Sequence, residues 1–178
     1  MRTLYKLLSL FMIFGCSSSE SINQDLLNKK DGFFYTKDTN ELYSGKVFSL
    51  YDDGNKESEW TLKDGRLDGL YTLWYKSGRK WLENIYKDGK LDGLITTWYE
   101  NRQKKEEETF KDGKQDGLST NWYENGQKEG EGTFKDGKLE GLVTGWYENG
   151  QKKEEVTFKD GEMISKKYWN EDGSVIDF

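Results

Sequence analysis

Residues 115–138 read Q-D-G-L-S-T-N-W-Y-E-N-G-Q-K-E-G-E-G-T-F-K-D-G-K, and this stretch of 24 residues recurs along the chain. The tripeptide K-D-G returns with the same period, starting at Lys63, Lys87, Lys111, Lys135 and Lys159. The pair Trp-Tyr keeps the same phase and starts at Trp74, Trp98, Trp122 and Trp146. Self-similarity at a fixed period is typical of repeat architectures, in which each unit packs on its neighbours. The sequence therefore predicts an array of structural repeats.

Two dipeptides divide each unit into a pair of short segments. Asn125-Gly126 lies inside the unit, and Asp136-Gly137 joins it to the next one. Both dipeptides favour the positive φ angles that tight hairpin turns require. Each unit is therefore predicted to be a β-hairpin, and the array an all-β, antiparallel meander of about ten or eleven strands, elongated and twisted. Asn101-Arg102 departs from this pattern, and we expect a strained or looser turn there.

Two-residue turns at both ends of a unit would fix the strand register. They would pair Trp122 with Glu129 and Thr120 with Glu131, and place Thr120, Trp122 and Glu131 on one face of the sheet. The two strands would then differ in length by two residues, so that each unit slides against the last unless a glycine bulge absorbs the difference. We expect a staggered sheet that curls, since open sheets beyond about ten strands rarely stay flat.

The composition excludes several kinds of chemistry. The chain has 178 residues, no histidine, no proline, one cysteine and a net charge of -6. Without histidine there is no imidazole base, no Ser-His or Cys-His nucleophile pair and no histidine metal ligand. We expect no metal and no cofactor. Mean hydropathy is low at -0.99, but seven Trp, eleven Tyr and nine Phe argue for a folded chain, because disordered chains are poor in aromatic residues.

The N-terminus has the features of a secretory signal. Arg2 and Lys6 flank the start of an apolar stretch over residues 7–15, which is too short to span a bilayer as a helix. The stretch ends in Ile13-Phe14-Gly15-Cys16, which resembles a bacterial lipobox, with Phe14 in place of the usual small residue. The resemblance implies that Cys16 becomes the first mature residue and carries acyl chains.

Three segments are predicted along the chain: a lipoprotein signal peptide over 1–15, a polar tether over 16–32 and the repeat domain over 33–178. Several acyl chains on Cys16 would hold the protein firmly at the cell envelope, in the outer membrane or facing the periplasm. Loss of the signal removes two basic residues and leaves 25 Lys+Arg against 33 Asp+Glu. We therefore expect no nucleic-acid partner, and membrane contact only through the anchor.

The repeated motifs G-L-x-T-x-W-Y-E-N-G-Q-K and K-D-G-K-L-D-G resemble the MORN-repeat superfamily in its bacterial variant, over about residues 33–178. That variant includes chains described as YwqK-family antitoxins of toxin-antitoxin systems. The resemblance implies a non-enzymatic β-hairpin scaffold that contacts a protein partner. The contact with that partner would neutralise a toxin, or would serve an immunity role at the envelope.

Aromatic side chains are the candidates for binding that partner. The Trp-Tyr pairs could pack the repeats, or could stack on sugars, contact a protein or take cations. Trp60 and Trp81 fall where other units carry Lys, Glu or Gly, and residues that break a repeat are the better site candidates. The expected partner-binding residues are Trp60, Trp81, Trp74, Trp98, Trp122, Trp146, Tyr99 and Tyr123. A protein is the leading expectation for the partner, and a carbohydrate of the cell envelope is the alternative.

Acidic residues give two further alternatives. One carboxylate per unit forms a ladder of Glu59, Glu83, Glu107, Glu131 and Glu155. Paired carboxylates can hydrolyse glycosides, but a ladder that recurs in every unit is better explained by pairing with Thr and Lys. Asp64 and Asp68 could be imagined as calcium ligands, yet the loops are too short to bring six to eight oxygens together, and turn chemistry already accounts for Asp-Gly.

Overall fold

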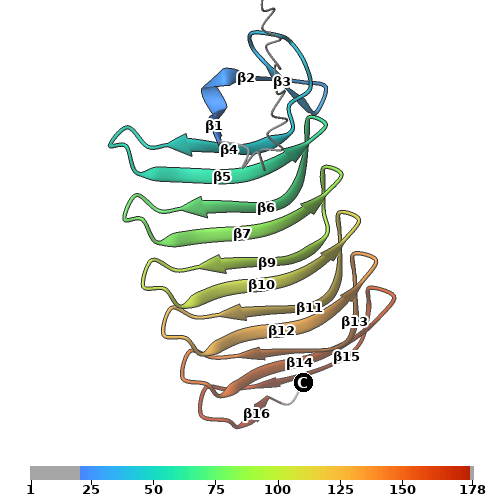
Figure 1. The fold of residues 1–178 in the computed structure, drawn as a ribbon. Coiled ribbons are helices and arrows are strands. Elements are labelled where there is room, and N and C mark those ends of the chain that lie inside the picture. Colours follow the sequence, from blue (N-terminus) through green and yellow to red (C-terminus); the bar gives the residue numbers. More distant parts are fainter. Residues whose placement is uncertain (1–20, 177–178) are drawn as a thin grey trace, which may run out of the picture.

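A computed structural model describes residues 21–176 of the chain. They form one sheet of 14 strands and a separate two-stranded sheet. Figure 1 shows an elongated stack of bowed hairpins that turns gradually from one end to the other. The prediction of an all-β meander of repeated hairpins is confirmed, although the number of strands exceeds the predicted ten or eleven.

The strands of the main sheet follow chain order from β4 onward, and β1 pairs in parallel with β4 at one edge. These strands are β1 (Ile22–Asn23), β4 (Gly45–Leu50), β5 (Lys56–Lys63), β6 (Arg66–Trp74), β7 (Lys80–Lys87), β8 (Lys90–Leu91), β9 (Gly93–Trp98), β10 (Lys104–Lys111), β11 (Lys114–Trp122), β12 (Lys128–Lys135), β13 (Lys138–Trp146), β14 (Lys152–Lys159), β15 (Glu162–Trp169) and β16 (Val175–Ile176). The remaining elements are the 3-10 helix η1 (Gln24–Leu26) and the pair β2 (Leu27–Lys30) and β3 (Phe33–Thr36).

Asp-Gly joins successive units by a two-residue turn, as predicted. Lys135 pairs with Lys138, so that Asp136 and Gly137 alone form the loop. Their φ angles are 50° and 83°, and positive φ at both positions is what a type I′ turn requires. The N–H of Asp136 also donates to Oδ2 of Asp116 at 3.3 Å. Asp68 and Glu140 accept the equivalent bonds from Asp88 and Asp160, so these acidic residues support a neighbouring turn, in line with the turn role predicted in preference to calcium binding.

The turn inside each unit is longer than predicted. The N–H of Tyr123 donates to the carbonyl of Gln127 at 2.9 Å, which leaves a three-residue loop ending at Gly126. Gly126 has a φ of 86°, and a type I turn followed by a left-handed glycine is a standard three-residue hairpin loop. Trp122 consequently pairs with Lys128, and the predicted pairing of Trp122 with the residue after Lys128 is wrong.

Arg102 occupies the turn position that glycine holds in the neighbouring units. Its φ is 76°, in the left-handed region where a residue with a Cβ is destabilised by about 1–2 kcal/mol. The strained turn predicted at Asn101-Arg102 is confirmed.

Replacing Arg102 with glycine is expected to stabilise the array by about 0.5–1 kcal/mol, because the relief of strain exceeds the added flexibility of the unfolded chain. Urea unfolding would measure the change. The control Arg102→Ala removes the same side chain but keeps the strain, so its gain should be much smaller. Equal stability of the two variants would contradict the turn geometry.

The hairpins are in register and not staggered. Thr120 pairs with Glu131, and Glu131 pairs with Thr144 of the next unit, so equivalent residues of successive units share one row. Between Glu140 and Thr144, β13 has two more residues than the facing part of β12. Gly141 lies in this bulge and has a φ of 79°. The predicted staggered sheet is therefore wrong, because a glycine bulge in each unit absorbs the difference in strand length.

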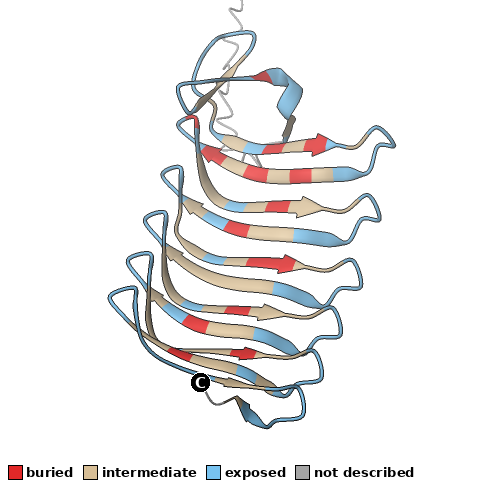
Figure 2. Cartoon of the chain, turned by 180° about the vertical axis from the view of Figure 1, so that it is seen from behind, coloured by how far each residue is buried: buried red, intermediate tan, exposed pale blue. Residues whose placement is uncertain are grey.

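The tightest packing lies at the N-terminal end of the array. Its buried hydrophobic cluster consists of Leu27, Val47, Trp60 and Leu62. Figure 2 shows the same concentration of buried residues on β4 and β5, and isolated buried positions in later strands. The polar tether predicted over 16–32 is wrong from residue 22 onward, because Leu27 is a core residue and β1 pairs with β4.

The predicted signal peptide over 1–15 and the predicted lipidation site Cys16 lie outside the described residues. Within residues 21–176, no helix has the length and apolar character needed to cross a bilayer.

Candidate functional site

The two faces of the sheet carry different kinds of side chain, because neighbouring residues of a strand point to opposite sides. One face carries residues that recur in each unit and is called the repeat face. In β11 and β12 it comprises Leu118, Thr120, Trp122, Lys128, Glu131 and Thr133. The other face carries residues that change between units and is called the variable face. In the same strands it comprises Ser119, Asn121, Gly130, Gly132 and the recurring Phe134.

On the repeat face, the lysine of each unit contacts both its own glutamate and the tryptophan of the next unit. Lys80 Nζ lies 2.5 Å from Glu83 Oε2 and 5.8 Å from the centre of the Trp98 ring. The same contacts link Lys56 to Trp74, Lys104 to Trp122, Lys128 to Trp146 and Lys152 to Trp169. Each exposed ion pair or cation-π contact is worth at most about 1 kcal/mol. These contacts therefore stabilise the array through their number, because they recur from unit to unit.

The repeated tryptophans predicted to bind a partner are therefore engaged within the array. Trp74, Trp98, Trp122 and Trp146 are half-buried, and a lysine of the preceding hairpin lies over each ring. The glutamate ladder is engaged in the same way, with each carboxylate paired to the lysine three residues earlier in its own strand. Among residues 21–176, no three Cys, Asp or Glu side chains gather as a metal site.

Tyr99 and Tyr123, which were also predicted to bind a partner, hold successive units together. The Tyr99 hydroxyl donates to the carbonyl of Trp122, and the Tyr123 hydroxyl to that of Trp146, both at 2.8 Å. Equivalent bonds start from Tyr51, Tyr75 and Tyr147. Burial raises the pKa of Tyr99 and Tyr123 above 10.0, and nearby glutamates, Glu129 first, raise it further. The phenols therefore keep the protons that these bonds need.

These tyrosine bonds predict a loss of stability at alkaline pH. Because the folded-state pKa lies above the unfolded value of 10.0, the stabilisation is complete below pH 10 and is lost as pH rises through the folded-state pKa. In urea unfolding from about pH 9 to about pH 11, the double variant Tyr99→Phe, Tyr123→Phe should lose less stability than the wild type. Lysine deprotonation affects both proteins alike, so an equal loss in the two would contradict the role given to the phenols.

Trp60 and Trp81, the two tryptophans that break the repeat, differ in exposure. Trp60 is 5% exposed and stacks on Tyr71 with ring centres 5.7 Å apart. It therefore belongs to the core cluster, and only a small part of the predicted binding residue is open to a partner. Trp81 is 43% exposed and lies beside Tyr75, with ring centres 6.2 Å apart.

One position of the variable face shows how far the units differ. At intervals of 24 residues it is occupied by Trp60, Asn84, Glu108, Gly132 and Val156. Glu108 accepts hydrogen bonds from Gln115 Nε2 at 2.8 Å and Ser119 Oγ at 3.5 Å. Burial raises the pKa of the Glu108 carboxyl, and the charge of Glu106 raises it further. The side chain at this position therefore changes in every unit, from aromatic to amide, carboxylate, glycine and aliphatic.

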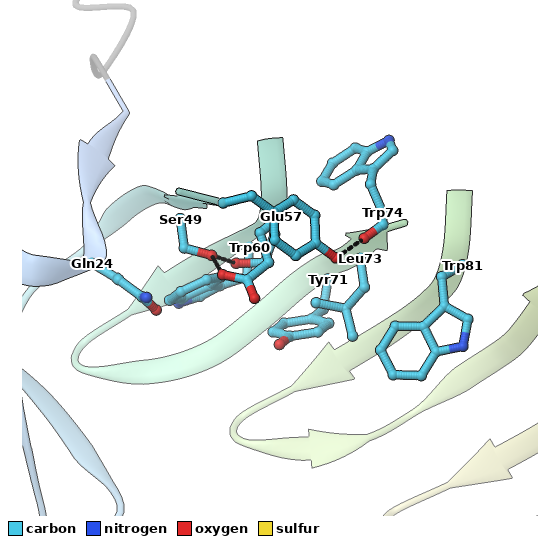
Figure 3. A pocket seen from close by; sticks show the side chains of 10 residues that line it. Gln24, Ser49, Glu57, Trp60, Tyr71, Leu73, Trp74 and Trp81 are labelled. Atoms are coloured by element: carbon cyan, nitrogen blue, oxygen red, sulfur yellow. Dashed lines mark hydrogen bonds between the residues drawn. The ribbon is translucent and has the colours of Figure 1, made fainter. Parts of the chain in front are cut away.

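The variable face ends, toward the N-terminus, in a cavity of about 340 Å³. Its walls include Gln24, Ser49, Glu57, Trp60, Tyr71 and Trp81. Figure 3 shows the rings of Trp60, Tyr71 and Trp81 along this group, with the ring of Trp74 turned away from them. Ser49 Oγ donates to Glu57 Oε2 at 3.0 Å and shares a hydrogen bond of 2.5 Å with Ser58 Oγ.

The structure thus brings Trp60 and Trp81 together and adds residues that the sequence reasoning missed. Tyr71 could have been found by the same criterion, because the other units carry Ile95, Ser119 and Val143 at its position. Gln24 was missed because its segment was predicted to be a tether. Glu57 gave no signal in the sequence, where it is one acidic residue among many.

The comparison with known families agrees with this architecture. The family model described as MORN repeat variant matches residues 115–136 and 139–160. Each matched segment covers one hairpin, β11–β12 and β13–β14. A search of curated proteins finds no match to the chain. The matched segments are similar to MORN repeats of the variant type, and the chain is a repeat protein in which earlier hairpins make the same turn, lysine and tyrosine contacts.

Proposed function

We propose that the chain is a membrane-anchored, non-enzymatic repeat protein that binds a protein partner through its variable face. MORN repeats are in general modules that bind proteins or membranes. The observation that carries the proposal is the difference between the two faces. Recurring side chains of the repeat face are used in contacts between units, whereas the variable face changes from unit to unit. Selective recognition of one partner needs such a surface, since identical units alone cannot define a position along the array.

The variable face offers the mixture of surface found at protein interfaces. Ile95 and Val143 provide apolar side chains, while Asn121 and Glu108 provide polar groups among them. Interfaces combine an apolar centre with a polar rim in this way. The hydrophobic cluster is confined to the N-terminal end, so within residues 21–176 no second layer covers this face from β9 to β14 (Figure 1).

The repeat face carries a competing apolar row. It consists of Leu70, Leu94, Leu118 and Leu142, which are 49%, 42%, 51% and 52% exposed. Successive leucines are two strands apart, about 9.6 Å, from a strand spacing of about 4.8 Å. Because every unit presents the same leucine, this row can contact an apolar surface without specifying which one. An experiment must therefore separate the two faces.

The finer form of the proposal is a lipid anchor at Cys16 and a toxin as the partner, both motivated by the sequence resemblances. The chain carries 33 Asp+Glu against 27 Lys+Arg, and an acidic surface favours encounter with a basic one. A basic toxin, neutralised by occlusion of its active surface, is the partner class that fits these features. The envelope location follows from the anchor.

Affinity capture with two adjacent substitutions tests the face that binds. Ser119→Arg alters the variable face and Leu118→Arg the repeat face, one residue apart on β11. The wild-type full chain and Leu118→Arg are expected to capture the same protein from a lysate of the source organism in stoichiometric amount. Ser119→Arg should retain at least tenfold less, with an unchanged circular dichroism spectrum.

Loss of capture in Leu118→Arg but not in Ser119→Arg would overturn the assignment of the binding face. Absence of any stoichiometric protein would contradict protein binding itself. The toxin proposal has its own readout. Expression of the captured partner alone should arrest growth, and co-expression of this chain should restore it.

A further inference from the structure

Several side chains that line the cavity at the N-terminal end of the variable face do not recur in the later units. Trp81 forms one of its walls, and the equivalent positions of later units hold Lys105, Glu129 and Lys153. Trp60 forms another, and Asn84 follows it in the next unit. Gln24 is contributed by η1, which precedes the hairpins. The repeat itself therefore does not explain why these side chains come together.

Polar groups of the cavity have unused hydrogen-bonding capacity. Trp60 Nε1 is buried and has no acceptor among the described residues, although a buried N–H without a partner is costly. The Glu57 carboxylate accepts one bond from Ser49, which leaves most of its lone pairs free. Trp60 Nε1 is enclosed by the protein, so the polar groups open to a ligand are the Glu57 carboxylate, a strong acceptor, and the Gln24 amide, which can both donate and accept.

Aromatic rings supply the apolar part of the cavity. Trp60 and Tyr71 stack with an angle of 29° between their planes, and Trp81 stands on the strand beyond them, 43% exposed (Figure 3). Tyr71 is on β6 and Trp81 on β7, so paired strands hold both rings. The volume of about 340 Å³ falls at the lower end of the range for small-ligand sites, about 300–1,000 Å³.

We propose that this cavity binds a neutral sugar ring of a glycan. A pyranose has C–H faces that pack on aromatic rings, and its hydroxyls can donate to Glu57 and accept from the Gln24 amide. A quaternary ammonium ion would suit the rings and the carboxylate, but it can neither donate a hydrogen bond to the Gln24 amide nor accept one from it. An anionic sugar would be repelled by Glu57. A neutral saccharide is the ligand class that satisfies all three features.

This site is separate from the surface proposed to bind a protein. It uses residues of η1 and β4 to β7, whereas the protein-binding test uses Leu118 and Ser119 on β11. Either proposal can fail while the other stands, because purified sugars test the cavity without any protein partner.

Saturation-transfer difference NMR on the full chain tests the proposal, in a detergent without a sugar headgroup. The probes are cellotriose, maltotriose and the N-acetylglucosamine trimer, with choline chloride as the cationic probe. At least one trisaccharide is expected to bind with a Kd of about 1 mM or tighter, and choline is not. Ring protons of one sugar unit should receive the strongest saturation, because that unit packs on Tyr71 and Trp81.

Three substitutions and a control connect binding to the cavity. Trp81→Ala and Glu57→Gln should each raise the Kd of the trisaccharide about tenfold. Gln24→Leu removes the side-chain amide at similar size, and should weaken binding several-fold. Trp122→Ala removes an aromatic ring of the repeat face and should leave binding unchanged.

Two results would overturn the proposal. One is the absence of binding by all three trisaccharides at about 10 mM, with the wild type folded. The other is trisaccharide binding that Trp81→Ala and Glu57→Gln leave unchanged. Binding of choline alone, lost in Trp81→Ala, would identify a cation site and equally reject a sugar.

Discussion

Replacing Trp60 with alanine is expected to destabilise the N-terminal end of the array by about 3–5 kcal/mol. The indole is 5% exposed and packs in the cluster that contains Val47 and Leu62, which are 0% and 2% exposed. Removing the indole leaves a cavity in this cluster. The rest of the sheet is a single layer, so little neighbouring structure can collapse into the cavity.

Hydrogen exchange with mass spectrometry would locate this effect. In a repeat array each unit depends mainly on its neighbours, so β4 to β6 should lose protection while β12 to β14 keep it. Val156→Ala is the matched control, because Val156 is 7% exposed and lies near the other end. Its smaller effect should be confined to β13 to β15. An even loss of protection along the array in the Trp60 variant would contradict a core confined to one end.

Replacing Cys16 with serine is expected to move the full chain from the membrane fraction to the soluble fraction. The prediction rests on the lipobox-like residues Ile13-Phe14-Gly15-Cys16. The cysteine is the one thiol in the sequence, and serine removes the acyl acceptor at nearly constant size. Several acyl chains hold a protein at a membrane firmly, whereas one chain holds it only marginally.

Metabolic labelling with an alkyne-tagged fatty acid would measure this change in a bacterial host. The wild type should carry label and sediment with membranes, and Ser17→Ala should behave as the wild type. Cys16→Ser should carry none. Membrane association that survives in Cys16→Ser would show that another feature attaches the protein, and would remove the basis for the proposed envelope location.

Much of the fold could be predicted because each unit repeats the same turn chemistry. Asp136-Gly137 closes a two-residue turn as expected, since both residues accept positive φ. Asn125-Gly126 was assigned the same turn, but only Gly126 is left-handed there. The dipeptide is compatible with both loop lengths, and the choice depends on the bond from Tyr123 to Gln127, which the sequence pattern does not specify.

The remaining errors have a common physical origin. The sequence gives strand lengths but not where a strand bends, so a bulge at Gly141 could be named only as an alternative to stagger. The polar composition of the segment around Leu27 concealed its one buried side chain. The bulge depends on how β13 pairs with β12, and the burial of Leu27 depends on its packing with Val47 and Trp60; the sequence pattern specifies neither contact.

The candidate site was predictable in part. The rule that residues breaking the repeat are the better candidates selected Trp60 and Trp81, which line one cavity. It could not tell that Trp60 is buried while Trp81 is exposed, since both are tryptophans on strands of the same sheet. For the repeated tryptophans the sequence left open packing between repeats or binding of a partner, and the lysines over their rings show that they take part in packing.

Site-specific photocrosslinking tests most directly the central claim that the variable face binds the partner. A photoreactive phenylalanine analogue is placed at Ile95 or Val143 on the variable face, and at the adjacent Leu94 or Leu142 on the repeat face. We predict a crosslinked protein of one mass from Ile95 and Val143, and none from Leu94 and Leu142. Crosslinking from the two leucine positions alone, or equally from all four, would contradict the account.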